Sequence, residues 1–429
     1  MVITIFPAYR TNQIVEKVSN ETNDVRNFTG IINSQIDNSR VASLLGIKYA
    51  TQIVAFPISG IITDKISPEL VMLIGLILES ISYFFYGASE SFPIVCIARF
   101  IDGVGSAFYS TAALTLIYIL TPSYRFRNKL ITINSICSFI AISAAPLAAG
   151  ASYQYTLLWT GNANIARWAT FSTIGPCLII ITVVTLVAGF NNNSTRKSTH
   201  ENDSNQLSKS NHYNSNESFT HIGIIARDPY ILISVVYLAV FSIPLYSFQA
   251  TLPTYMYNKF GSDETKQGLV WFGCLSSIPG FLFGSIIYHK FIEKCCLVCM
   301  LNLIVIGIVS ILMVFVEPWW TTSIILGIIN FSGSLIEVIL IPFIATLTDT
   351  RYTGNYGGSS SLTMLSYTLS GIFGTFPVGF IVEKTDFSIL CYILAFLCIP
   401  FSPAILFCRK YFKKPEIIYS ISENDEILL

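Results

Sequence analysis

Charged side chains are scarce in this sequence. Asp, Glu, Lys and Arg together make up 12% of its 429 residues, whereas hydrophobic residues make up 52%. Soluble domains carry roughly twice that share of charge, so the composition is that of a polytopic membrane protein. Lys plus Arg and Asp plus Glu are equal at 25 each, and this balance gives no basic field that would attract nucleic acid.

Residues that build metal and nucleotide sites are also few or poorly placed. All ten cysteines lie in or beside apolar runs, where cysteine behaves as a small hydrophobic residue. Cys295, Cys296 and Cys299 cluster, but they open a hydrophobic helix with only His289 nearby, so we predict no metal site. No disulfide framework and no Walker motif can be read. We therefore expect a protein that is not an enzyme and has no cofactor, driven by a gradient.

Long apolar runs are abundant. A hydrocarbon core of about 30 Å needs about 20 apolar residues for each crossing helix, which predicts an all-α membrane protein. The predicted spans are 41–62, 70–88, 93–120, 130–152, 167–189, 229–252, 268–287, 295–316, 321–347, 358–382 and 387–408. The opening stretch "MVITIFPAYR" is typical of the last turns of a further helix, so we expect a first helix that is largely missing.

A polar, low-complexity stretch divides the chain. It has too few apolar residues to fold alone. The predicted parts are an N-terminal helical bundle (1–189), a disordered cytosolic linker (190–228), a C-terminal helical bundle (229–408) and a cytosolic tail (409–429).

The distribution of Lys and Arg predicts the orientation. Cytosolic loops of membrane proteins are enriched in these residues, which places the 190–228 linker and both termini of the complete protein in the cytosol. The 10–40 segment is then luminal, and its Asn20 and Asn27 triplets are candidate N-glycosylation sites.

The two halves echo one another. "GIITDK" closes the second predicted helix of the full protein, and "GSIIYHK" closes the eighth. Parallel six-helix halves around a central site are typical of transporters.

Several motifs resemble the major facilitator superfamily. "GIITDK" is similar to its loop signature between the second and third helices, Arg99 in "IARFIDGVGS" matches its fourth-helix arginine, and "AISAAPLAAG" resembles the fifth-helix signature of drug and proton antiporters. Within the superfamily the chain resembles the vesicular amine transporters. The stretches that carry this resemblance are "VITIFPAYR", "SLLGIKYATQIVAFPISGIITDKI", "ARDPYILI", "FQATLPTYM", "IEVILIPFIATLTDTRYTGNYG" and "FSPAILFCRKYF".

The resemblance implies two six-helix bundles and an antiporter in a synaptic or secretory vesicle membrane. Its substrates would be protons and a small cationic amine such as a monoamine or acetylcholine, and its other partner the lipid bilayer. Two alternatives stay open. One is a proton-coupled exchanger of organic cations, polyamines or drugs from the same superfamily, and the other is a transport-inactive scaffold or receptor.

Five charged residues lie within the predicted spans, away from their ends. They are Lys48, Glu79, Arg99, Asp102 and Glu337. A charge at the centre of a membrane helix costs roughly 2.5–3.5 kcal/mol on insertion scales, so it persists only if it is paired, hydrated or neutralised. Two cations face three carboxylates, and a surplus carboxyl that takes up and releases protons is what a proton-coupled exchanger needs.

The resemblance assigns a role to some of these residues. Glu337 matches a tenth-helix acid needed for proton coupling, although a structural ion pair is the alternative. Lys48 matches a lysine that pairs with an eleventh-helix acid in relatives, but here Met364 is near the expected place. Lys48 must therefore pair with Glu79, Asp102 or Glu337, or reach the membrane interface instead.

Asp102 and Glu79 each have more than one possible role. Arg99 and Asp102 are three residues apart and share a helix face, so we expect them to form an ion pair. The alternative hypothesis is that Asp102 also relays protons. Glu79 has no counterpart in the family pattern and could be a lipid-edge acid, a pairing partner or a substrate contact.

Three further groups complete the candidate site. Gln249 stands where monoamine-transporting relatives have a glutamate and would balance no charge. Aromatic residues could contact an amine through cation–π interactions; the candidates are Tyr246, Phe248, Tyr255, Trp271 and Tyr367. Charges at cytosolic helix ends could hold the halves together; these are Asp64, Lys65, Asp349 and Arg351.

Overall fold

The computed structural model describes most of the chain. It covers residues 38–88, 91–120, 124–172, 227–262, 264–351 and 356–409, with positions 180, 181 and 184. Every regular element in these ranges is helical, which confirms the predicted all-α class.

The described helices fall into two groups along the chain, one on each side of the 173–226 stretch. The first group is α3 (Asn38–Lys65), α4 (Pro68–Ala88), α5 (Phe92–Leu120), α6 (Tyr124–Thr160) and α7 (Ala163–Ser172). The second group is α10 (Pro229–Phe260), α11 (Glu264–Val270), η3 (Trp271–Ser276), α12 (Ser277–Lys290), η4 (Ile292–Lys294), α13 (Cys295–Leu312), η5 (Met313–Phe315), α14 (Trp319–Arg351), α15 (Tyr356–Lys384), α16 (Phe387–Phe401) and η6 (Ser402–Cys408).

Ten helical segments in the described ranges are long and apolar enough to cross a bilayer. They coincide with ten of the eleven predicted spans and confirm a multi-pass membrane protein. The predicted span 167–189 begins in α7, and most of it lies outside the described residues.

Several helices extend beyond their predicted bounds. α6 has 37 residues and α10 has 32, against predicted spans of 130–152 and 229–252. At about 1.5 Å per residue both exceed the roughly 30 Å hydrocarbon core. The prediction followed only the apolar stretch, whereas a helix continues into polar and aromatic residues outside the core.

The eighth predicted helix, 268–287, is not one regular helix. It is divided into α11, η3 and α12, and the tighter turn of η3 places Gly273 against the backbone of α14 at Gly327. Such a local tightening allows one helix to adjust to its neighbour, and hydropathy cannot reveal it.

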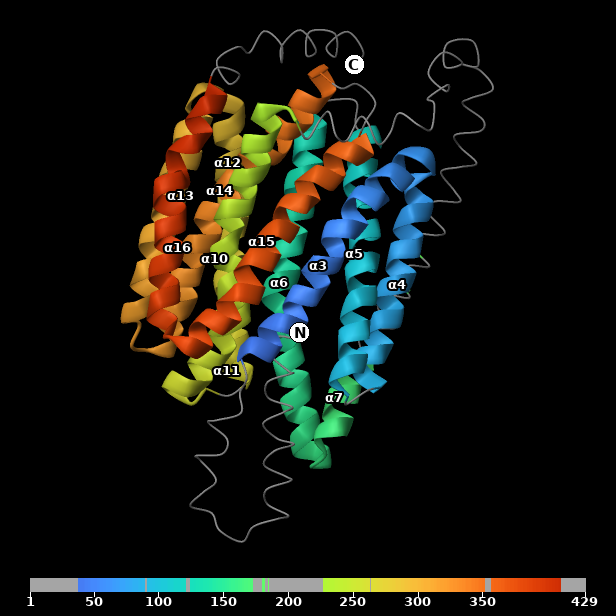
Figure 1. The fold of residues 1–429 in the computed structure, drawn as a ribbon, viewed down its shortest axis with the longest axis vertical. Coiled ribbons are helices and arrows are strands. Elements are labelled where there is room, and N and C mark those ends of the chain that lie inside the picture. The colour runs from blue at the N-terminus through green and yellow to red at the C-terminus, as the bar shows by residue number, and fades with distance from the viewer. Residues whose placement is uncertain are drawn as a thin grey trace.

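The helices form two bundles. In Figure 1, α3 to α7 lie on the right and α10 to α16 on the left. The halves meet mainly where α3 packs along α15 and where α6 packs along α11, η3 and α12, and α5 also contacts α15. This is the expected two-bundle arrangement, and it places α3, α6, α10, α14 and α15 at the centre of the molecule.

Small residues let α3 and α15 approach closely. A Cβ atom at Gly60 would lie 2.8 Å from the Ser361 Oγ atom and 3.0 Å from the Gly357 carbonyl oxygen. Close backbone approach of this kind is the usual way in which membrane helices associate, since lipid provides no hydrophobic force between them.

Candidate functional site

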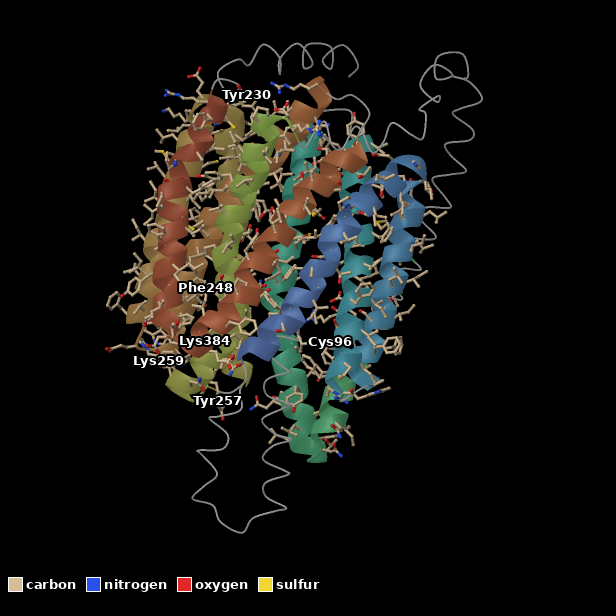
Figure 2. The ribbon with its side chains drawn as sticks, in the orientation of Figure 1. Cys96, Tyr230, Phe248, Tyr257, Lys259 and Lys384 are labelled. Atoms are coloured by element: carbon tan, nitrogen blue, oxygen red, sulfur yellow. The ribbon has the colours of Figure 1, made fainter. Side chains whose placement is uncertain are left out.

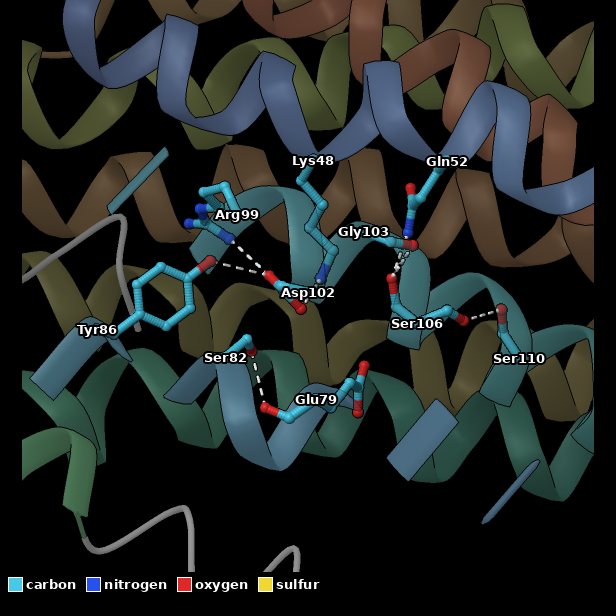
Figure 3. A network of polar contacts seen from close by, with 10 residues as sticks. All are labelled: Lys48, Gln52, Glu79, Ser82, Tyr86, Arg99, Asp102, Gly103, Ser106 and Ser110. Atoms are coloured by element: carbon cyan, nitrogen blue, oxygen red, sulfur yellow. Dashed lines mark hydrogen bonds and ion pairs between the residues drawn. The ribbon is translucent and has the colours of Figure 1, made fainter. Parts of the chain in front are cut away.

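An ion-pair cluster joins α3 to α5 in the N-terminal half. Asp102 is 2% exposed and accepts from Lys48 Nζ at 3.0 Å and from Arg99 Nη1 at 3.1 Å. The Tyr86 hydroxyl donates to the same carboxylate at 3.2 Å (Figure 3). The structure therefore contains the expected Arg99–Asp102 pair, and of the three acids considered for Lys48 it selects Asp102.

A glycine makes this cluster sterically feasible. A Cβ atom at Gly103 would lie 2.8 Å from the Lys48 carbonyl oxygen and 2.9 Å from Thr51 Cβ. The ion pair of Lys48 with Asp102 thus lies within the N-terminal half. The only acid in α15 is Glu383, near its end, and Met364 packs instead against the apolar cluster of Ala55, Phe56 and Ala107.

Glu79 faces this cluster from α4. Its Cγ would be 3.1 Å from a Cβ atom at Gly105, and its carboxylate interacts electrostatically with Lys48 and Asp102 (Figure 3). Within the described residues it forms no ion pair. Glu79 is thus neither at the lipid edge nor a direct partner of Lys48 in this conformation.

Glu337 lies near the middle of α14 and is 8% exposed. Ser135 on α6 donates a hydrogen bond of 3.1 Å to its Oε1 atom. No Lys, Arg or His side chain pairs with it in the part of the chain that the structure describes. The alternative of a structural ion pair with a neighbouring helix therefore finds no support among these residues.

Two tyrosines stand beside Glu337. Tyr246 on α10 and Tyr367 on α15 are close enough to interact electrostatically with the carboxylate, and the Tyr367 hydroxyl is buried without a completed hydrogen bond. Helices from both halves thus meet at Glu337, since α6 belongs to one bundle and α10, α14 and α15 to the other. The side chain points into the junction of the two bundles.

A tyrosine pair connects the two charged centres. Tyr49, next to Lys48, makes an edge-on contact with Tyr246, with 5.2 Å between ring centroids. The Tyr49 ring packs on Gly371 and Tyr246 packs on Gly374, both in α15. Sequence reasoning missed Tyr49 and Ser135, and no local motif distinguishes either of them.

The other aromatic candidates lie apart from Glu337. Phe248 is fully buried near Phe387, with 6.1 Å between ring centroids (Figure 2). Tyr255 stacks on Phe387 with 4.0 Å between ring centroids. Its hydroxyl oxygen accepts a hydrogen bond of 2.7 Å from Lys259 Nζ. Trp271 belongs to the large apolar core that extends from the C-terminal bundle to α5 and α6. These three side chains pack the C-terminal bundle.

Gln249 is half-buried on α10, three residues from Tyr246. Among the described residues it makes no hydrogen bond or ion pair. Its amide is therefore not committed to a partner within this part of the protein.

The candidate gate residues separate in the structure. Asp64 accepts a hydrogen bond of 2.9 Å from the Gly357 N–H and so joins α3 to α15. Arg351 pairs with Asp228 inside the C-terminal half, and Lys65 is exposed. The side chain of Asp349, like the residues Asn20 and Asn27, lies outside the described part. Of the predicted gate, Asp64 is the residue seen to connect the bundles.

Asp228 was missed as a structural residue although the sequence carries a signal for it. Its carboxylate accepts from the Tyr230 N–H at 3.0 Å and caps α10, with Pro229 in the first turn. Asp followed by Pro at the start of an apolar run is a typical helix beginning, and the cap holds Arg351 in place.

Comparison with known families identifies this architecture. The family model described as "Major Facilitator Superfamily" matches residues 27–375. The chain belongs to the Major Facilitator Superfamily. It is accordingly a membrane transporter of two helical bundles and not an enzyme.

Curated relatives within the superfamily cover most of the chain. A vesicular acetylcholine transporter of Torpedo torpedo is 24% identical over 401 residues, which is 91% of this chain and 71% of the relative. One from Drosophila melanogaster is 24% identical over 393 residues, 90% and 64% of the two chains. A probable vesicular acetylcholine transporter-B of Danio rerio is 24% identical over 408 residues, 94% and 76%.

Proposed function

We propose that this superfamily member is a proton-coupled antiporter that loads a cationic amine into vesicles, with protons leaving the lumen in exchange. The observation that carries the proposal is Glu337, a carboxyl buried between the two bundles with no cation paired to it among the described residues. The relatives named above are described as vesicular acetylcholine transporters, which supports an acetylcholine-like amine as the substrate.

A buried carboxyl without a counter-ion has two states of low free energy. It can hold a proton and be neutral, or it can be ionised beside a cationic ligand. A proton and an ammonium group therefore compete for Glu337, and the competition couples the movement of one to the countermovement of the other. Ser135 holds the carboxyl in one orientation by donating to Oε1.

Tyrosine rings around Glu337 suit an ammonium ligand. Tyr246 and Tyr367 lie beside the carboxyl, and Tyr49 touches Tyr246 from the other half. A quaternary ammonium has no N–H to donate, so aromatic faces can bind it where hydrogen-bond acceptors alone cannot. The sequence distinguishes no particular ring here; the proximity of these three to the carboxyl supports their role.

Alternating access requires contacts between the halves that can break. The Asp64–Gly357 bond lies at one end of α3, and the Tyr49–Tyr246 contact lies toward the other. The Lys and Arg distribution predicts that the Asp64 end is cytosolic. In this proposal the first contact opens for cytosolic amine and the second for release into the lumen.

Transport by the purified full chain tests the proposal. In proteoliposomes with an acidic interior, uptake of radiolabelled acetylcholine or serotonin should be saturable and should stop when an ionophore collapses the pH gradient. Glu337→Gln should abolish gradient-driven uptake, because the amide keeps the side chain's volume but cannot exchange a proton. Glu317→Gln, which changes an exposed acid between two spans, is the matched control.

Uptake that survives collapse of the gradient would disprove antiport. Normal uptake by a folded Glu337→Gln variant would make Glu337 structural. A folded chain with no saturable uptake or binding for any amine would indicate a scaffold or receptor.

A second candidate function is exchange of other organic cations or polyamines. The uncharged Gln249 on α10 and the pairing of Lys48 within its own half favour it, since both differ from the pattern of the amine-transporting relatives. Competition by polyamines and bulky organic cations that exceeds competition by acetylcholine and monoamines would select this candidate.

A further inference from the structure

The charges of the N-terminal cluster do not balance without Glu79. Lys48 and Arg99 are both paired with the single carboxylate of Asp102, each with a different oxygen. Two cations on one carboxylate leave one positive charge in excess. Glu79 is the remaining carboxylate that faces this cluster in the described part of the chain (Figure 3), and only its ionised form makes the cluster neutral.

The groups around Glu79 have opposite effects on its ionisation. Lys48, from α3, favours its ionised form, whereas burial and Asp102, from α5, favour its protonated form. Tyr83 on α4 and Tyr109 on α5 also face it, and both are neutral near physiological pH. The described residues of α7, which also packs on α4, add no charge that acts on Glu79. Burial is the largest of these influences, so water that reaches Glu79 can change its charge.

Close packing holds Glu79 against α5, the helix that carries Asp102. A Cβ atom at Gly105 would lie 2.9 Å from both the Glu79 nitrogen and the Gly75 carbonyl oxygen, so α4 and α5 touch at this level. The lysine head is a compact ammonium on a flexible four-carbon stem, and the Lys48 side chain is 25% exposed. It is therefore less confined than the Asp102 carboxylate to which it donates.

We propose that Glu79 is a second proton-exchanging carboxyl, located in the N-terminal half, and that Lys48 moves between Asp102 and Glu79 according to the charge of Glu79. When Glu79 holds a proton, Lys48 donates to Asp102, as in this structure. When the proton leaves to water, the Lys48 ammonium shifts toward the Glu79 carboxylate, and Asp102 keeps Arg99 and the Tyr86 hydroxyl. The inference rests on the proposed function only in that proton exchange drives transport; it concerns a carboxyl other than Glu337.

Infrared difference spectroscopy of the reconstituted full chain, without substrate, tests this directly. A protonated carboxyl has a C=O band that vanishes on ionisation, so a stepped pH titration follows each buried carboxyl. The wild type should lose two such components as the pH rises. Glu79→Gln should remove one and Glu337→Gln the other, the double variant both, and the exposed-acid variant Glu317→Gln neither.

Lys48→Gln tests whether the Lys48 ammonium interacts with the ionised Glu79 carboxylate. The Glu79 component should then persist in alkaline samples in which the wild type has lost it, because the cation that favours ionisation is gone. If Glu79→Gln does not fold, Glu79→Asp should retain a titrating component with a changed band frequency.

The outcomes separate the two ideas. An unchanged titration spectrum in Glu79→Gln, or in Glu79→Asp where that variant is needed, overturns the inference. An unchanged Glu79 component in Lys48→Gln overturns the role of Lys48. A spectrum that loses its component in Glu79→Gln but not in Glu337→Gln would remove Glu337 as the proton-exchanging residue of the proposed function and leave this inference standing.

Discussion

The Asp64 carboxylate accepts a hydrogen bond from the Gly357 N–H across 293 residues of sequence, at 2.9 Å. Gly357 is the second residue of α15, so the carboxylate lies at the positive end of that helix's dipole. One acidic side chain of the N-terminal half thereby caps a helix of the C-terminal half. A nearby hydrogen bond from Thr115 to Ser360, of 3.1 Å, joins α5 to the same turn.

Asp64→Ala should loosen this end of the molecule. A hydrogen bond to a charged group contributes about 1.5–3 kcal/mol, and every 1.4 kcal/mol is a factor of ten. Because Asp64 is exposed, we expect the lower end of this range, which is about tenfold faster amide exchange at the start of α15. Hydrogen–deuterium exchange with mass spectrometry measures it.

Lys65→Ala is the matched control, since it removes a neighbouring exposed charge that forms no ion pair among the described residues. Equal exchange rates in the two variants would show that the Asp64 bond does not hold the halves together.

Gly103→Ala should destabilise the N-terminal half. The new methyl group would lie 2.8 Å from the Lys48 carbonyl oxygen and 2.9 Å from Thr51 Cβ, so α3 and α5 must separate. Overpacking of this kind costs about 1–3 kcal/mol. The midpoint of thermal unfolding in detergent should fall by several degrees.

Gly87→Ala provides the comparison for that change. Its nearest contacts are at 3.6 and 3.7 Å, which is ordinary van der Waals distance, so its unfolding midpoint should stay close to that of the wild type. An equal loss in both variants would contradict the steric argument, because alanine favours the helix more than glycine does and the α3–α5 contact would then not set the cost.

Asp102→Asn should be much more damaging than Lys48→Gln. The first leaves Arg99, 6% exposed, without its carboxylate, and breaking a buried pair in this way costs about 3–5 kcal/mol. The second leaves Asp102 paired with Arg99 and bonded to Tyr86. Folded yield and unfolding midpoint should therefore fall far more in Asp102→Asn.

A reversed order would show that Lys48 is the main counter-ion of Asp102 and that Arg99 is stabilised elsewhere. The Arg99→Lys variant distinguishes this case, because it keeps the charge but loses the planar guanidinium that lies 5.3 Å over the Tyr86 ring.

The sequence alone determined the class of the protein and its unusual residues. Apolar runs separated by polar turns define membrane helices, because each must satisfy its own backbone hydrogen bonds in lipid. A charge inside such a run, as at Glu337 or Asp102, is visible for the same reason. The Arg99–Asp102 pair was also readable, since a spacing of three places both on one helix face.

Only the tertiary structure decided which residues meet. Lys48 could have paired with any of three acids, no local motif distinguished Tyr49 or Ser135, and the motif that contains Gly357 did not reveal Asp64 as its partner. Between membrane helices no difference in hydrophobicity fixes the rotation or depth of one helix against another; small residues and polar contacts do so. The partners of each buried charge therefore follow from close approaches such as those at Gly60 and Gly103, which depend on pairs of residues far apart in the chain.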